Sequence, residues 1–286
     1  MKSYSQFQED KILLNIFNKK EIDHGFFLEF GAWDGIYLSN CRIFYELGWH
    51  GCFIEADKKK FLNLKKNYQE DKNIILLNEY IDPKNNTLDN LINKNNISQI
   101  DLLSIDVDGL DLTLLKSLKS IRPKTIIIEC NLDIPFDVNF EDINNEQIGS
   151  SLLAINNFAQ EINYEIIGAT ICNLILIDKF FNKNDFKTLN INDIFNLTKP
   201  TRVSWTNRGE IIFFNNNILE RKEYFKIPTQ KSFIIFQPIP KLLRFFTNVN
   251  GEGVKLIKII YSNTLFLILR PILFFLRIFK KFFKKN

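Results

Sequence analysis

Residues 26–35, read FFLEFGAWDG, combine an apolar run with an acid and two glycines. The apolar residues suit a strand that is buried on both faces of a parallel sheet. The glycines let the backbone turn sharply and let a ligand approach it closely. Ser39 and Asn40 follow as N-cap residues for a helix over residues 41–47. A strand, a glycine turn and a helix N-terminus together make half of a nucleotide-type binding site.

The spacing of the glycines narrows the choice of ligand. The pattern G-x-G-x-x-G is absent because Trp33 stands in place of its second glycine, so a pyrophosphate would lack close backbone contact. Twenty residues after Gly35, a predicted strand over residues 51–54 ends in Glu55, which is placed to accept hydrogen bonds from ribose hydroxyls. A ribose-bearing ligand without a pyrophosphate is therefore favoured, and S-adenosylmethionine fits. In the alternative interpretation, Glu29 and Glu55 are solvated carboxylates at strand ends.

Predicted strands and helices alternate along most of the chain. We expect helices over residues 4–17, 41–47, 58–68, 88–92, 112–118 and 152–162, and strands over residues 26–30, 51–54, 74–77, 101–105, 125–128, 164–169 and 173–177. Such alternation implies crossover connections and a parallel sheet. The irregular stretch 132–149 is long enough for a substrate loop or lid.

Four of the predicted strands deliver an acid to the same edge of the sheet. These acids are Glu29, Glu55, Asp106 and Glu129. Ligands of doubly wound sheets bind at the carboxyl edge of the strands. We therefore expect the four side chains to converge on one crevice, with Asp108 and Asn131 beside them.

Several segments resemble one protein family, in the order in which the family has them. They are YSQFQED, LEFGAWDG, SNC, GWHGCFIEAD, LLSIDVDGLD, IIIECN and YEIIGATICNLILI, which lie between Tyr4 and Asp178. The chain resembles the FkbM-type S-adenosylmethionine-dependent methyltransferases. The resemblance implies a Rossmann-like class I methyltransferase fold, α/β in class, with a mostly parallel seven-stranded sheet and helices on both faces. It also implies action on hydroxyl groups of sugars or secondary metabolites.

Candidate cofactor-binding residues follow from the residues above and from the resemblance. They are Gln6, Asp10, Glu29, Gly31, Ala32, Asp34, Gly35, Asn40, Glu55, Asn78 and Asp106. Gln6 and Asp10 are included on the resemblance alone, and Asn78 would face the adenine edge. The chain departs from the family at Gln8, where glycine is common, and at Trp33 and Asp34, where asparagine or a small residue is common. These departures bear on substrate and rate more than on fold.

Transfer of a methyl group to a hydroxyl needs alignment and removal of a proton. Because an alcohol is weakly acidic, a base or a metal ion must help. Asp106, Asp108 and Glu129 are the candidate catalytic residues, and Asp106, Glu129 and Asn131 could hold Mg²⁺ as in metal-dependent O-methyltransferases. In the alternative interpretation, Asp106 orders its turn, Asp108 stabilises the N-terminus of the following helix, and the pair after the fifth strand satisfies loop amides.

Charge is distributed unevenly along the chain. The formal net charge is +4, but eight bases and no acid follow Glu252, which leaves residues 1–254 at −4. An acidic body argues against a nucleic-acid surface. Four scattered cysteines without a C-x-x-C pair indicate neither a disulfide framework nor a zinc site. Together with an N-terminus that lacks a signal-peptide pattern, they favour the cytoplasm.

The basic tail, residues 255–286, is rich in aromatic and aliphatic residues. Its apolar run 259–276 is only 18 residues long and contains Arg270 and Pro271, so it is a poor membrane-spanning helix. On a helix, Arg270, Arg277, Lys281 and Lys284 would form one stripe. This pattern predicts an amphipathic helix that lies peripherally on an anionic membrane surface, on its inner face. The alternative is a helix packed on the protein itself or on a second subunit.

These observations predict three segments and one main function. The segments are a methyltransferase domain over residues 1–200, an extension over residues 201–254 packed on it, and the membrane-associating tail. We expect O-methylation of a sugar hydroxyl on a glycan or glycolipid. A non-catalytic, membrane-tethered binding module on the same scaffold is the main alternative. A nicotinamide-dependent oxidoreductase is disfavoured by the missing middle glycine.

Overall fold

The structure is a computed structural model, and it divides into two units, Met1–Lys199 and Pro200–Asn286. In the first unit it describes residues 2–83, 85–145 and 147–198. In the second it describes residues 202–205, 211–214, 218–221 and 225–228, and the single residues 260, 263, 264, 267, 268, 271 and 275. Each unit is described separately below.

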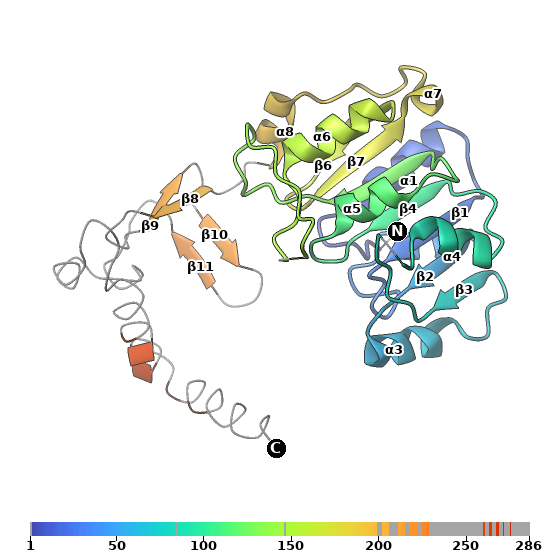
Figure 1. Ribbon diagram of the computed structural model, residues 1–286, viewed down its shortest axis with the longest axis horizontal. Coiled ribbons are helices and arrows are strands. Elements are labelled where there is room, and N and C mark those ends of the chain that lie inside the picture. Colours follow the sequence, from blue (N-terminus) through green and yellow to red (C-terminus); the bar gives the residue numbers. More distant parts are fainter. Residues whose placement is uncertain are drawn as a thin grey trace. The chain divides into compact units, whose positions relative to one another are not determined.

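A seven-stranded sheet forms the centre of the first unit (Figure 1). In spatial order its strands are β3 (Ile74–Leu77), β2 (His50–Ile54), β1 (Phe26–Phe30), β4 (Leu102–Ile105), β5 (Thr125–Glu129), β7 (Asn173–Asp178) and β6 (Tyr164–Ala169). The pairs from β3 to β5 are parallel, whereas β7 runs antiparallel to both β5 and β6. The predicted class I methyltransferase architecture is confirmed in this strand order.

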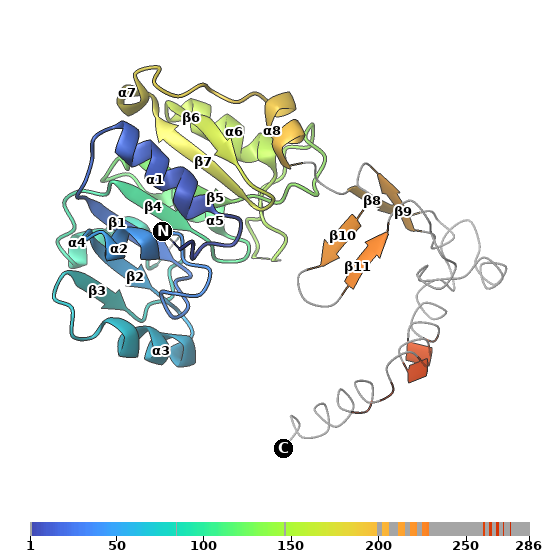
Figure 2. The ribbon, with the colours of Figure 1, turned by 180° about the vertical axis from the view of Figure 1, so that it is seen from behind.

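Helices cover both faces of the sheet. In Figure 1 the helices α4 (Leu88–Lys94), α5 (Asp111–Ser117) and α6 (Leu152–Glu161) lie over one face, and Figure 2 shows α1 (Glu9–Lys19), α2 (Arg42–Glu46) and α3 (Lys58–Tyr68) over the other. Two hydrophobic clusters fill the space between sheet and helices. Because successive strand residues point to opposite faces, Leu28 packs in the first cluster and Phe27 in the second. Strands covered on both sides need mostly apolar residues, and residues 26–30 have four of them beside Glu29.

The strand order reverses at β1, which pairs with β2 on one side and β4 on the other. The chain leaves β1 through α2 toward one edge of the sheet and later crosses back to add β4 and β5 on the other side. Such a switch point leaves a crevice at the carboxyl ends of the two central strands, where ligands of open α/β sheets bind. The glycine turn after β1 and the acids after β4 both lie at this point.

The N-terminal helix begins later than predicted. It starts at Glu9 rather than near residue 4, because Gln8 has a left-handed backbone conformation (φ 67°) that interrupts helical geometry. Ser5 forms a parallel bridge with Leu38 in place of a helical turn. Residues 3–8 therefore form a non-helical strap beside the loop that follows the glycine turn.

Two helices after β7 were not predicted. These are α7 (Lys179–Asn182) and α8 (Ile191–Thr198), and Ile194 of α8 is buried in the main core. Helix α7 is only one turn long, which is too short for a hydrophobic period to reveal. In α8 the apolar residues Ile191, Ile194 and Phe195 do have helical spacing, and that spacing was the available signal.

The described residues of the second unit include two short antiparallel strand pairs. One pairs β8 (Arg202–Trp205) with β9 (Ile211–Phe214), and the other pairs β10 (Ile218–Arg221) with β11 (Phe225–Pro228). Within the extension over residues 201–254, these four strands are described, whereas most of the predicted tail helix lies outside the described residues. The described tail residues are helical. Within the described part of the chain, no helix has the length and apolar character to cross a membrane.

Candidate active site

The glycine turn after β1 contacts the end of β4. Gly31 has φ 68°, and a Cβ atom at this position would lie 1.9 Å from the backbone oxygen of Asp106. Any other residue would therefore meet both backbone strain and a clash. The turn is also attached to β2, since the Ala32 N–H donates to the Ile54 oxygen at 3.1 Å. Gly31 thus brings the turn and the first acid after β4 together at the switch point.

Glu29 ties the end of β1 to the start of α2. Its buried carboxylate accepts from the Ser39 hydroxyl at 2.6 Å and from the Asn40 N–H at 2.8 Å. Burial nevertheless raises the pKa of Glu29 to about 7. The Asn40 side chain donates to the Ser104 hydroxyl on β4 at 3.1 Å. Both predicted cofactor residues thus stabilise the junction between the turn and the helix.

Glu55 follows β2 and accepts hydrogen bonds beside the glycine turn. Its carboxylate accepts from the Trp33 N–H at 2.9 Å and from the Asp57 N–H at 2.7 Å. Each carboxylate oxygen has two lone-pair sites, so these bonds leave capacity for two hydroxyl donors. Asn78 donates to the backbone oxygens of Glu55 and Ala56 at 2.7 and 3.2 Å, which orients its amide at the same strand ends. This donor and acceptor set fits a nucleoside.

The tip of the turn carries exposed aromatic side chains. Trp33 has φ 52°, an unusual value for a bulky residue, and its side chain is 42% exposed. The Lys60 ammonium lies 4.0 Å from the centre of the Trp33 ring. The Trp33 and Tyr37 rings contact each other in an edge-on arrangement. The Asp34 carboxylate accepts from the N–H groups of Ile36 and Tyr37 at 2.9 and 2.7 Å. Asp34 therefore shapes the turn through local backbone bonds.

Three carboxylates from neighbouring strand ends meet at one place. Single oxygens of Asp106, Asp108 and Glu129 lie within 4.8 Å of one another. Burial, together with repulsion from Asp106, Asp111 and Asp108, raises the pKa of Glu129 from 4.5 to about 9. Glu129 therefore carries a proton at neutral pH. Of the four strand-end acids expected to converge, Asp106 and Glu129 thus meet, together with Asp108.

The loop after β4 is held by a fourth acid. Asp111 is fully buried, and its carboxylate accepts from the N–H groups of Val107 and Gly109 at 2.8 and 3.0 Å. Burial raises the pKa of Asp111. Asp111 also begins α5, so this acid, rather than Asp108, stands in the first turn of the helix. Sequence reasoning overlooked Asp111, although it is the third acid of the run DVDGLD.

The N-terminal strap is fastened by Asp10. This buried carboxylate accepts from the hydroxyls of Ser3 and Ser5 at 2.6 and 2.9 Å and from the Tyr4 N–H at 2.6 Å. Gln6 is half-buried within the same strap. Asp10 thus bonds the strap and the neighbouring Lys11 N–H, and its contact with a cofactor stays a prediction.

Glu9 connects the strap to the residues between β6 and β7 and to the start of β7. Its buried carboxylate accepts from the Thr170 hydroxyl at 2.7 Å and from the Asn173 side chain at 3.2 Å. Asn173 pairs directly with Glu129 across β5 and β7. The strap therefore reaches the strand end that carries the third acid of the trio.

Residues 132–149 contain no helix or strand among those described, as predicted for an irregular stretch. Asn131 donates to the Ile148 oxygen at 2.7 Å, and its own side-chain oxygen accepts from the Asp133 N–H at 3.0 Å. The role of Asn131 as a metal ligand stays a prediction, since both ends of its amide serve the loop. Glu141 attaches the loop to α5 through Thr113, at 3.1 Å.

Residues 75–166 match the family model described as Methyltransferase FkbM domain. The resemblance to FkbM-type methyltransferases is confirmed over this segment. The FkbM match runs from β3 into β6, and it includes the carboxylate trio and Asp111. Over these residues the chain is thus similar to the FkbM methyltransferase domain. A comparison with curated proteins gives no match.

Several solved structures are similar at low sequence identity. TrmK of M. capricolum, in complex with S-adenosyl-homocysteine, is 16% identical with a TM-score of 0.37, and the match covers 64% of this chain and 74% of that chain. An S-adenosylmethionine-dependent methyltransferase from Clostridium acetobutylicum is 8% identical with a TM-score of 0.41, and the match covers 60% and 92%. TehB from Haemophilus influenzae is 13% identical with a TM-score of 0.37, and the match covers 58% and 62%. The fold assignment rests on the strand order.

Other residues of this FkbM-type site were missed because their partners are distant in the sequence. Arg42 of α2 bonds Tyr68 of α3, which in turn bonds the glycine turn. Both residues lie in helices whose apolar spacing gives no sign of a polar contact. Only the packing of α2 and α3 on the same face of the sheet brings them together.

Proposed function

We propose that this chain is an S-adenosylmethionine-dependent O-methyltransferase that acts on a sugar hydroxyl of a glycan or glycolipid. One observation carries the proposal: the carboxylates of Asp106, Asp108 and Glu129 meet within 4.8 Å at the switch point of an FkbM-type domain. The Gly31 turn contacts the Asp106 backbone, and Glu55 follows β2, the neighbour of β1. A nucleoside site and a proton acceptor thus lie at the same edge.

The residues at β1, β2 and β3 suit the nucleoside part of the cofactor. Glu55 would accept the ribose hydroxyls, the oriented amide of Asn78 would face the adenine edge, and the Gly31 turn would let the backbone approach. When bound, S-adenosylmethionine supplies a methyl group already activated by its sulfonium. The chain must then hold the acceptor hydroxyl in line and remove its proton.

The three carboxylates of the trio have different roles in proton transfer. Because Glu129 holds a proton at neutral pH, it acts as a hydrogen-bond donor, and the accepting carboxylate is Asp106 or Asp108. Asp108 is exposed, whereas Asp106 is half-buried. Asp108 is therefore the group that an acceptor hydroxyl reaches, and it is the proposed base. The left-handed conformation of Asp108 (φ 58°) fixes its place in the turn.

A divalent cation is the alternative way to lower the pKa of the hydroxyl. Three carboxylates offer the oxygen ligands that Mg²⁺ prefers. A bound cation would favour ionised carboxylates and so would displace the Glu129 proton. Addition of Mg²⁺ would then shift the pH profile of turnover to lower pH, and a chelator would abolish the shift. If neither Mg²⁺ nor the chelator changes the pH profile of turnover, the base acts without a metal ion.

The experiment for the proposal is methyl transfer from labelled S-adenosylmethionine to glycan and glycolipid acceptors by the full chain. Asp108→Asn should lose at least about 100-fold in turnover, the usual contribution of general base catalysis, and keep its cofactor affinity. The matched control is Asp23→Asn, an exposed aspartate before β1 at the opposite edge of the sheet, which should keep full turnover. Cofactor binding without turnover on any acceptor would instead support a binding module.

The proposal includes a location. The basic, aromatic tail would hold the chain on an anionic membrane surface, where glycolipid acceptors are presented. Support comes from the sequence pattern alone, in which eight bases and no acid follow Glu252. Turnover on a glycolipid in anionic vesicles should then exceed turnover on the same glycan in solution.

A further inference from the structure

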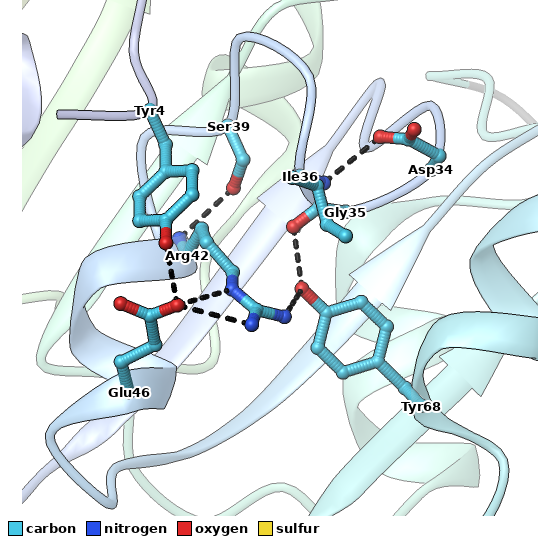
Figure 3. A network of polar contacts seen from close by, with 8 residues as sticks. All are labelled: Tyr4, Asp34, Gly35, Ile36, Ser39, Arg42, Glu46 and Tyr68. Carbon is cyan, nitrogen blue, oxygen red and sulfur yellow. Dashed lines mark hydrogen bonds and ion pairs between the residues drawn. The ribbon is translucent and has the colours of Figure 1, made fainter. Parts of the chain in front are cut away.

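A polar network connects the N-terminal strap to the glycine turn (Figure 3). Its members, here called the brace, are Tyr4, Arg42, Glu46 and Tyr68. At the inner end, the Tyr68 hydroxyl donates to the backbone oxygen of Gly35, and Arg42 Nη1 donates to the same hydroxyl at 2.9 Å. The brace thus holds the last residue of the turn through its carbonyl.

The outer end of the brace reaches the strap. Glu46 accepts from Arg42 Nε and Nη2 at 3.1 and 3.0 Å, and its same Oε1 atom accepts from the Tyr4 hydroxyl at 2.6 Å. The Arg42 guanidinium also lies 5.4 Å from the centre of the Tyr68 ring and 5.7 Å from that of Tyr4. One guanidinium therefore joins two tyrosines that are 64 positions apart in the sequence.

Arg42 has a second connection to the site through its backbone. Its N–H donates to the Ser39 hydroxyl at 2.9 Å, and that hydroxyl donates to the Glu29 carboxylate. The first residue of α2 is thus fixed to the end of β1 by its main chain and to the turn by its side chain. Movement of α2 would disturb both ends of the glycine turn together.

Tyr68 also supports the turn by packing. A Cβ atom on Gly35, which has φ 73°, would lie 2.4 Å from the Tyr68 ring. The ring is buried and packs on Phe53 of β2 at 4.8 Å between centroids. Because the ring cannot move without disturbing the core, its hydroxyl is a fixed donor for the Gly35 oxygen. The hydroxyl is buried, so an unmade bond would be costly there.

We infer that the brace sets the cofactor affinity by fixing the glycine turn, with Tyr68 and Arg42 as positioning residues and Tyr4 as their link to the strap. The inference rests on the proposed function, because it concerns the same nucleoside site. A turn that samples other conformations binds more weakly in proportion to the fraction that is competent. Loss of the brace lowers that fraction and leaves the carboxylate trio in place.

The test is calorimetry of S-adenosylmethionine binding and steady-state kinetics with Tyr68→Phe in the full chain. Loss of one buried hydrogen bond should weaken binding about fivefold. The cofactor KM should rise by a similar factor, while kcat at saturating cofactor stays unchanged. The matched control is Tyr45→Phe. The Tyr45 ring contacts Tyr68 edge-on, and the hydroxyl that this variant removes has Asp71 as its side-chain partner. This control should bind the cofactor like the wild type.

A melting curve separates positioning from simple structural support. If Tyr68→Phe lowers the melting temperature and leaves the dissociation constant unchanged, the inference is overturned. Tyr4→Phe provides a second variant should Tyr68→Phe not fold, since the Tyr4 hydroxyl bond lies at the exposed end of the brace. We expect about a twofold weaker dissociation constant for Tyr4→Phe, and no change would again overturn the inference. Failure of the wild type to bind the cofactor would refute the proposed function instead.

Discussion

Three glutamates at strand ends differ in their roles because their surroundings differ. Glu29 is buried but accepts two strong hydrogen bonds, and its pKa is raised only to about 7. Glu129 meets three further carboxylates in addition to burial, and its pKa rises to about 9. Glu55 accepts from two backbone N–H groups beside the glycine turn. One residue type thus serves as a junction, a proton holder and a proposed ribose acceptor.

The raised pKa of Glu129 predicts a pH-dependent stability. Because the folded state binds this proton more tightly than the unfolded state does, the free energy of unfolding should fall as pH rises from about 5 to 9. Glu129→Gln mimics the protonated form, so its free energy of unfolding should fall less over this pH range than that of the wild type. The difference should be about 3 kcal/mol, at roughly 1.4 kcal/mol per pKa unit with allowance for partial exposure. Urea unfolding at several pH values measures the slope.

The exposed glutamate Glu70 supplies the control for this prediction. Glu70→Gln should keep the wild-type slope. Equal slopes for wild type and Glu129→Gln would show that the proton of Glu129 does not differ between the folded and unfolded states.

The sequence predicted which acids stand at the carboxyl edge, but not what each one bonds. In a parallel sheet the strand ends follow from the apolar pattern, so Asp106, Asp108 and Glu129 could be placed together. Hydrogen-bond partners depend on backbone conformation and on contacts distant in the sequence. Asp10 and Asp34, expected at the cofactor, make their described bonds to nearby backbone and hydroxyl groups.

At the scale of elements, most strands and helices were predicted within one or two residues. Helix α3 and strand β3 have the predicted bounds, since both are strongly patterned segments. The start of α1 was wrong by five residues, because the left-handed conformation of Gln8 and the bridge from Ser5 are tertiary effects. Short apolar helices such as α7 carry too few residues for a period to show.

The close approach of the turn to β4 predicts a strong dependence on Gly31. Gly31→Ala should lower the free energy of unfolding by more than about 2 kcal/mol, because strain at positive φ adds to a clash with the Asp106 backbone. Gly48→Ala is the matched control: Gly48 has φ 85°, and a Cβ atom there would meet nothing within 4 Å. The difference between the two variants in urea unfolding isolates the clash. Equal losses would contradict a tight contact between the turn and β4.

At the scale of the whole molecule, both the charge and the fold change toward the C-terminal part of the chain. Residues 1–254 carry a formal charge of −4, and the first unit ends at Lys199. The basic tail follows the strand pairs of the second unit, and most of it lies outside the described residues. The fold of the first unit could be predicted because its strand and helix segments alternate regularly.

The tail predicts peripheral binding to anionic membranes. The full chain should sediment with vesicles that contain about 30% anionic lipid, and high salt should weaken binding only in part, because apolar burial remains. A chain truncated after Gly253 should stay in the supernatant. A full chain that stays in the supernatant, or one that resists alkaline carbonate as an integral protein does, would contradict the prediction.

The central claim is that S-adenosylmethionine binds at the carboxyl edge with Glu55 on its ribose. Isothermal titration calorimetry of the full chain with S-adenosylmethionine tests it most directly, alongside Glu55→Gln and the exposed control Glu161→Gln. We predict binding by the wild type and the control at cofactor concentrations below roughly 1 mM. Glu55→Gln should bind more weakly by about 1.5–3 kcal/mol, the range for hydrogen bonds to a charged group. Absence of binding by the wild type, or equal affinity of Glu55→Gln, would contradict the claim.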